Sequence, residues 1–173
     1  MEDVRGKTVL VVDDEPHVRM YLQAVLEDAD FDVQTAANGN QALDKMTEKR
    51  PDVISLDLVM PHMSGLKFFK YIQKNKDRAD IPVVVVTAHA KDEMGSEDFE
   101  KIEQYKSDEC RIFMLEKPVD AVTYVDTIRQ ALELEPLGAQ SEEGESLRLQ
   151  VSDAVQAADR KSLEKALQIL KGS

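Results

Sequence analysis

The sequence predicts an α/β fold in which a doubly wound, five-stranded parallel sheet carries helices on both faces. Short apolar runs alternate along the chain with segments whose apolar residues recur every three or four positions. Four of these runs are nearly continuous in apolar residues, which is typical of strands buried on both faces of a parallel sheet. Strict alternation of strand and helix is the pattern of doubly wound domains.

The predicted strands are Thr8–Val12, Phe31–Thr35, Val53–Leu56, Val83–Val86 and Ile112–Leu115. The second strand alternates apolar and polar residues, as an edge or half-exposed strand does. A run such as Val53–Leu56 fits a strand that is covered on both faces.

Each strand is followed by a segment with helical periodicity. The apolar faces are predicted at Val18, Tyr21, Leu22, Val25 and Leu26, at Ala42, Leu43 and Met46, at Leu66, Phe69 and Ile72, weakly at Phe99 and Ile102, and at Val122, Val125, Ile128 and Leu132. Glu15-Pro16 opens the first helix, because proline suits a first turn, and Ser64 is a suitable cap for the third. Asn38-Gly39-Asn40 is expected to form a turn before the second.

Three parts are expected along the chain: a globular domain over residues 1–134, a linker over 135–146 and a helical tail over 147–173. The apolar residues of the tail form two clusters that point in different directions at ~100° per residue. They are Leu147, Val151, Val155 and Ala158, and then Leu163, Ala166, Leu167 and Leu170. A helical hairpin explains the two directions, with a single long helix as the alternative. Since short helices are marginal alone, we expect the tail to dock on the first domain, a second copy or a partner.

Composition narrows the function classes. A net charge of −12 over 173 residues disfavours binding to nucleic acid or to an anionic membrane surface. The single cysteine, Cys110, excludes an internal disulfide and is expected to be a small packed residue near a strand. Because no apolar run approaches the ~20 residues of a membrane span, we expect a cytoplasmic protein.

Polar side chains follow four of the predicted strands at the point where each strand ends. They are Asp13, Asp14, Asp57, Thr87 and Lys117. Because the carboxyl ends of parallel strands meet at one edge of a sheet, we expect these side chains to converge. Carboxylates brought together need a compensating cation, and hard oxygen ligands suit Mg²⁺. An aspartate nucleophile, a divalent cation, a lysine and a hydroxyl together indicate phosphoryl transfer to an aspartate.

The motifs Val-Val-Asp13-Asp14-Glu, Leu-Asp57-Leu-Val-Met-Pro61, Thr87-Ala88 and Lys117-Pro118 resemble those of the receiver domain of two-component response regulators. The resemblance extends from about Lys7 to Glu133 and implies the flavodoxin-like strand order 2-1-3-4-5.

The same resemblance implies roles for individual residues. Asp57 would accept a phosphoryl group from a histidine kinase or phosphotransfer protein. The ligands of Mg²⁺ would be Asp13, Asp14, Asp57 and the backbone carbonyl of Val59. Thr87 and Lys117 would bind the phosphoryl oxygens, and Lys117–Pro118 would be a cis peptide. Ala88, His89, Met114 and Pro118 would be switch or modulatory positions.

Two features depart from the family pattern. Met114 occupies the position of the usual switch tyrosine or phenylalanine, and Phe113, one residue before it, faces the other side of the sheet. Thr87 and Lys117 are separated by 30 positions, more than is usual in the family. We therefore expect activation to move the helix between Met94 and Lys106 more than the Met114 side chain.

The leading hypothesis is a phospho-accepting signalling switch, not an enzyme, whose output is contact with an unknown downstream protein, with a homodimer also possible. The tail carries six acids and five bases over residues 141–173, so it shows no basic recognition helix for nucleic acid. One alternative is an inert pseudo-receiver that serves as a scaffold. A second is an aspartate-nucleophile phosphatase, although Val59 stands where such enzymes need a further aspartate.

Overall fold

The computed structural model describes residues 4–60, 63–88, 101–102, 104–105 and 110–137. The chain divides into two units, and the fold below is that of the first, Met1–Pro136. The predicted tail, His89 and most of the segment between Met94 and Lys106 lie outside the described residues. None of the helices in the described part of the chain has the length and apolar composition that a membrane span requires.

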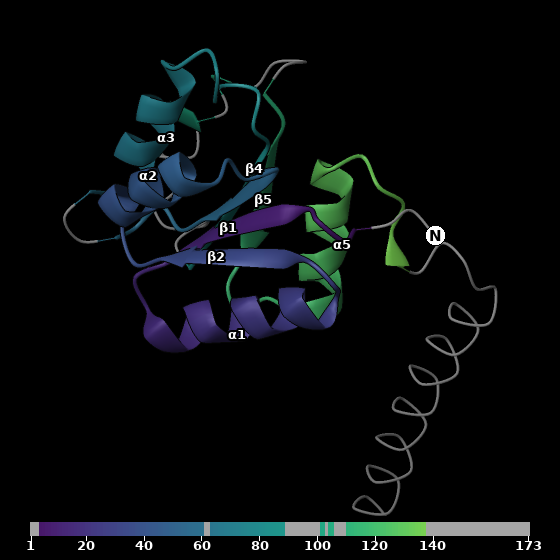
Figure 1. Cartoon of the computed structure of the whole chain (residues 1–173). Coiled ribbons are helices and arrows are strands. Elements are labelled where there is room, and N and C mark those ends of the chain that lie inside the picture. The colour runs from purple at the N-terminus through teal and green to yellow at the C-terminus, as the bar shows by residue number, and fades with distance from the viewer. Residues whose placement is uncertain (1–3, 61–62, 89–100, 103, 106–109, 138–173) are drawn as a thin grey trace, which may run out of the picture. The chain divides into compact units, whose positions relative to one another are not determined.

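A single parallel sheet forms the centre of this unit (Figure 1). Its strands are β1 (Thr8–Val12), β2 (Asp32–Ala36), β3 (Val53–Leu56), β4 (Val83–Thr87) and β5 (Ile112–Glu116). Their order is β2-β1-β3-β4-β5, as the resemblance implied. The predicted strand after the first helix is displaced by one residue, because the ladder with β1 begins at Asp32 and Phe31 is buried just before it. β4 and β5 each continue one residue beyond their predicted ends.

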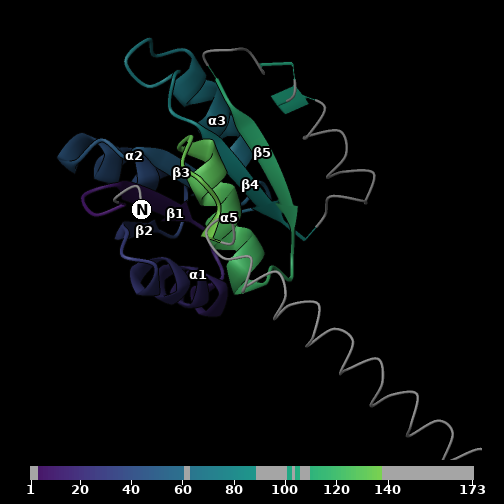
Figure 2. The same cartoon turned by 90° about the vertical axis from the view of Figure 1, so that its right-hand side faces the viewer.

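Helices cover both faces of the sheet. They are α1 (Pro16–Asp28), α2 (Gly39–Glu48), α3 (Gly65–Gln73) and α5 (Ala121–Ala131). Figures 1 and 2 show α1 and α5 on one face and α2 and α3 on the other. Two separate apolar cores follow from this arrangement, one under each helix pair.

The helix starts agree with the sequence. Pro16 stands in the first turn of α1, and the Ser64 hydroxyl accepts a hydrogen bond from the backbone N–H of Lys67 at the start of α3. The predicted turn before α2 is instead a cap, in which the Asn38 side chain accepts from the N–H of Gln41 and Gly39 is already helical. Polar residues that compete for backbone groups favour both turns and caps, which explains the difference.

Two predicted core positions are on the surface. Val122 is 44% exposed because the inner face of α5 is formed by Tyr124, Val125 and Ile128. Tyr21 is also 44% exposed, and its hydroxyl lies 3.4 Å from the Val119 carbonyl oxygen. The remaining predicted positions of α1, α2 and α3 pack as expected.

Candidate functional site

The carboxyl edge of the sheet brings Asp13 and Asp57 together because β1 and β3 are neighbours in register. Val12 pairs with Leu56, so the next residue of each strand carries its aspartate to the same level. The backbone N–H of Asp57 donates to the Val12 carbonyl at 2.9 Å, which fixes that register at the site itself.

Three carboxylates form one cluster at this edge. Oxygens of Asp13, Asp14 and Asp57 all lie within 4.8 Å of one another. Asp13 and Asp57 are only 1% and 5% exposed, so water offsets little of their mutual repulsion. The three carboxylates that the sequence placed at this edge therefore lie together in the structure.

Lys117 supplies the compensating charge. Its ammonium lies 2.8 Å from Asp13 Oδ2, 2.8 Å from Asp57 Oδ2 and 3.4 Å from Glu15 Oε1. Burial alone would lower the pKa of Lys117, but its bonds to Asp13 and Asp57 outweigh burial and raise it. The lysine therefore stays charged between the two carboxylates.

At Asp57 burial prevails over the charged partners, whereas at Lys117 the partners prevail. Burial raises the pKa of its carboxyl, and this cost exceeds the opposing contributions of Lys117 and of the Val59 N–H, which donates to Asp57 Oδ1 at 3.0 Å. The charge of Asp13 raises that pKa further. Asp57 is thus a carboxylate whose ionised form the fold only partly stabilises.

Thr87 and Lys117 stand at the carboxyl ends of the neighbouring strands β4 and β5. β4 pairs with β3 on one side and with β5 on the other, and Thr87 is level with Glu116. The Lys117 N–H donates to the Thr87 carbonyl at 3.0 Å, and the Lys117–Pro118 peptide is cis, as the resemblance implied. Thr87 is buried, whereas Ala88 after it is exposed.

The departure at the switch position holds in the structure. Met114 is partly buried on β5, and Phe113 packs with the core under α1 and α5. Adjacent strand residues face opposite sides of a sheet, so Phe113 does not replace the missing aromatic residue.

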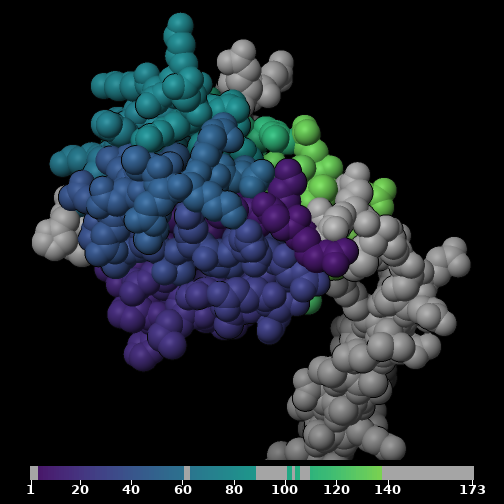
Figure 3. All heavy atoms as spheres, viewed as in Figure 1, coloured from purple at the N-terminus to yellow at the C-terminus, as the bar shows by residue number. Residues whose placement is uncertain are grey.

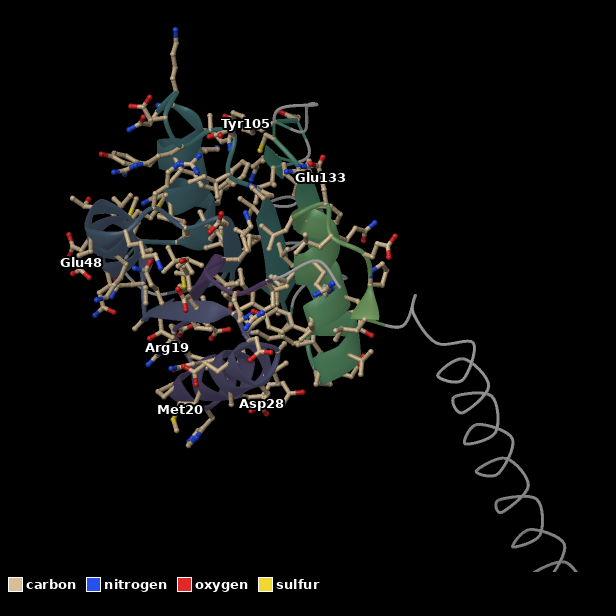
Figure 4. All side chains as sticks on the ribbon, turned by 45° about the vertical axis from the view of Figure 1, so that its right-hand side comes forward. Arg19, Met20, Asp28, Glu48, Tyr105 and Glu133 are labelled. Carbon is tan, nitrogen blue, oxygen red and sulfur yellow. The ribbon has the colours of Figure 1, made fainter. Side chains whose placement is uncertain are left out.

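Three supporting contacts were not predicted. The Glu15 N–H donates to Asp13 Oδ1 at 2.9 Å, and Arg19 Nη1 donates to the Asp13 carbonyl at 2.6 Å. Figure 4 places Arg19 on α1 beside the exposed Met20. Glu15 and Arg19 lie two and six residues after Asp13, and a helix starting at Pro16 places both side chains near the strand end; this spacing was the available signal.

The third unpredicted contact joins α3 to the strand end. Gly65 lies directly against the backbone of Asp57 and Leu58, and a Cβ on Gly65 would be 2.7 Å from Leu58 Cα and 2.9 Å from the Asp57 carbonyl carbon. The Gly65 N–H also donates to the Leu58 carbonyl at 3.0 Å. A glycine at the start of a helical run has several explanations in sequence, so only the structure identifies this close approach.

The donor set fits a hard divalent cation. Three carboxylates face one ammonium within the cluster, which leaves an excess of negative charge that a cation would balance. All the candidate ligand atoms are oxygens, the preference of Mg²⁺.

Comparison with known proteins gives consistent matches. A family model described as the response regulator receiver domain matches residues 9–129. The polar-differentiation response regulator DivK of Brucella anthropi is 30% identical over 126 residues, which cover 73% of this chain and 96% of DivK. The chemotaxis protein CheY of Thermotoga maritima is 39% identical over 79 residues, or 45% of this chain and 66% of CheY. The phosphate regulon transcriptional regulatory protein PhoB of Pseudomonas aeruginosa is 32% identical over 101 residues, and this chain spans only 44% of its length.

Solved structures agree on the fold. Chemotaxis protein CheY4 of Vibrio cholerae superposes with a TM-score of 0.63 at 29% identity, covering 73% of this chain and 98% of CheY4. The receiver domain of the sensor histidine kinase PA1611 from Pseudomonas aeruginosa has the same fold, with a TM-score of 0.63 at 23% identity, and covers 74% of this chain and 98% of that domain. That structure has a magnesium ion coordinated in its active-site cleft.

Proposed function

Because the chain belongs to the family of response regulator receiver domains, we propose that it accepts a phosphoryl group on Asp57 from a phosphohistidine of a kinase or phosphotransfer protein in the cytoplasm. Receiver domains of this kind are signalling domains of two-component systems, not conventional enzymes. The output of this one would be contact with a downstream protein.

The observation that carries the proposal is the ion-pair geometry around Lys117. One ammonium lies 2.8 Å from both Asp13 and Asp57, at the carboxyl ends of β1, β3 and β5. A structural salt bridge needs only one acid for each base, whereas here two buried acids share one lysine and a third carboxylate, that of Asp14, lies within 4.8 Å of them. Burying several carboxylates together destabilises a fold, and such clusters are found mainly at functional sites, where charge develops during a reaction.

The residues divide the work as follows. Asp13, Asp14, Asp57 and the Val59 carbonyl would hold Mg²⁺, which when bound supplies positive charge against the phosphoryl oxygens. Lys117 would turn from Asp57 to a phosphoryl oxygen, and the Thr87 hydroxyl would donate to another. The Lys117 N–H donates to the Thr87 carbonyl at 3.0 Å, so the backbone holds the two donors side by side.

In the transfer itself, an Asp57 carboxylate oxygen attacks phosphorus. The bond from phosphorus to the donor nitrogen breaks as the new phosphorus–oxygen bond forms, and the leaving imidazole keeps the bonding pair and takes up a proton. The Val59 N–H orients the carboxylate through its bond to Asp57 Oδ1. Because Asp57 is only 5% exposed, the acyl phosphate would form largely away from bulk water.

The test is incorporation of phosphate from a small-molecule donor such as acetyl phosphate, with Mg²⁺, followed by intact-protein mass measurement. We expect one phosphoryl group on the wild-type chain and none on Asp57→Asn. Asp52→Asn, at the other end of the same strand, is the matched control and should be labelled like the wild type. Equal labelling of Asp57→Asn would refute the assignment, and no labelling of the wild type would favour the inert scaffold.

A further inference from the structure

The outer side of α3 is basic, although the protein has a net charge of −12. Residues 65–78 contain five cations and one acid, a net charge of +4. The cations are Lys67, Lys70, Lys74, Lys76 and Arg78, and together with the 51%-exposed Tyr71 they are called the α3 basic face here. Figure 3 shows the α3 segment, in teal, at an open surface with side chains extending into solvent.

These cations differ from the other cations of the described chain. Among the described residues, no ion pair involves Lys67, Lys70, Lys74, Lys76 or Arg78. Every other described lysine and arginine makes an ion pair, a hydrogen bond or another electrostatic contact. On the adjacent helix α2, for example, Lys45 lies 2.9 Å from Glu48, which Figure 4 labels, and Lys49 lies 3.0 Å from Asp32. Within the described part of the chain, these five cations therefore stand apart as the ones whose side chains make no such ion pair, hydrogen bond or electrostatic contact.

Packing holds this face outward. Phe68, Phe69 and Ile72 are fully buried in the core under α2 and α3, so the helix cannot rotate to hide its lysines. Lys67, Lys70 and Lys74 are three and four positions apart, which places them along one side of the helix over ~10 Å. Tyr71 lies among them and adds apolar area to the charged stripe.

We propose that the α3 basic face is a docking surface for an acidic helical segment of a partner protein. A partner helix with carboxylates three and four residues apart would match the spacing of the lysines, and one apolar side chain would cover Tyr71. The net charge of the rest of the protein repels a long polyanion such as nucleic acid, whereas a short acidic helix meets only the local positive charge. This surface is outside the phosphorylation pocket, so the inference goes beyond the proposed function.

The experiment is fluorescence anisotropy of a labelled helical peptide of about 15 residues, with glutamates at three- and four-residue spacing and a central leucine, titrated with the full chain. We expect binding that weakens as salt rises, since exposed charges are screened. The double variant Lys67→Glu/Lys74→Glu should weaken it about tenfold or more, because two attractions become two repulsions.

The matched control is Lys45→Glu/Lys49→Glu, which makes the same change in net charge on α2, where both lysines already have acid partners. It should change affinity less than about twofold. Equal losses in the two double variants would overturn the proposal, as would tighter binding of a single-stranded oligonucleotide or a mass that doubles through contact of α3 with a second copy. The α3 variant should still take up phosphate on Asp57, so loss of peptide binding and failure of phosphorylation are separate results.

Discussion

Two aspartates flank the same central strand and have opposite surroundings. Asp52, just before β3, accepts a hydrogen bond from the Thr8 N–H at 2.8 Å and an ion pair from Lys7 at 3.3 Å, and its side chain is 34% exposed. Asp57, just after β3, is 5% exposed and shares a single lysine with a second buried acid.

The different surroundings of Asp52 and Asp57 indicate which edge of the sheet is suited to a reactive site. At the amino edge an acid completes the hydrogen bonding of a neighbouring strand and has a base of its own, so its charge is compensated. At the carboxyl edge the acids outnumber the base and burial raises the pKa of Asp57. The two ends of one strand thus carry a compensated acid and an acid whose charge is only partly compensated.

The largest expected effect on stability comes from removing Lys117, and removal of Lys7 at the other end of the sheet is the comparison. Lys117→Met leaves Asp13 and Asp57 buried without their shared cation, and we expect the free energy of unfolding to fall by about 2–4 kcal/mol. Lys7→Met removes a half-exposed partner of Asp52 and should cost less than about 1 kcal/mol. Urea unfolding of both variants at neutral pH, without added metal, measures the difference.

Added Mg²⁺ provides the control for that comparison. If the carboxylates hold the cation, Mg²⁺ should recover part of the stability lost in Lys117→Met and none of that lost in Lys7→Met. Similar losses of stability in the two variants would mean that the acids at the carboxyl edge depend on their lysine no more than Asp52 does at the amino edge.

The sequence predicted the Asp57 side of this contrast, because burial and strand ends can be read from apolar runs. The position of Asp57 follows from the run Val53–Leu56, and its neighbours follow from the equivalent ends of the other strands. The approach of Gly65 to the Asp57 backbone could not be predicted, since it depends on how close the start of α3 lies to the end of β3. Nor could exposure of Val122 be foreseen, because Tyr124 takes the inner face of α5, and tyrosine is acceptable at either position.

The next effect concerns that close approach. Gly65→Ala places a methyl group against the backbone of Asp57 and Leu58, which cannot move aside without displacing the strand end, and we expect a loss of about 1–3 kcal/mol. Gly39→Ala is the control, because its methyl group would meet only the flexible Met63 side chain, at 2.8 Å. It should be neutral to within about 1 kcal/mol. Urea midpoints and phosphorylation rates check both, and a Gly65→Ala variant that keeps wild-type stability and rate would contradict the contact.

A smaller effect distinguishes the aspartates themselves. Asp57→Asn removes a carboxylate that is costly to bury, so the free energy of unfolding should rise by about 1 kcal/mol, whereas Asp52→Asn should lower it by about 0.5–1 kcal/mol. A loss of stability in Asp57→Asn would show that the Lys117 pair outweighs burial.

The pH dependence gives an independent reading of the same difference. The folded-state pKa of Asp57 is raised, so the folded chain binds this proton more tightly than the unfolded chain. The stability that Asp57 contributes is therefore complete below its ordinary pKa of 3.8 and is lost as pH rises through the folded-state value. Urea unfolding at a series of pH values from about 3.8 upward measures this loss. The difference in free energy of unfolding between Asp57→Asn and wild type should widen as the pH increases.

The smallest expected effect concerns Tyr124, which lies in the core beneath the carboxylates of Asp13 and Asp57. The Tyr124 hydroxyl is fully buried beside Ser55, midway along β3, and makes no well-aligned hydrogen bond; burial, together with the charge of Asp13, raises its pKa. Tyr124→Phe keeps the ring and removes an unsatisfied polar atom, so the free energy of unfolding should stay within about 0.5 kcal/mol of wild type or rise slightly. Urea unfolding and the lifetime of the phosphorylated protein measure the two readouts. A loss beyond about 1.5 kcal/mol with a changed lifetime would place Tyr124 in the network of the site, because only a hydroxyl that bonds there would produce both. If the free energy of unfolding and the lifetime are both unchanged, the Tyr124 hydroxyl plays no part in the site around Asp57.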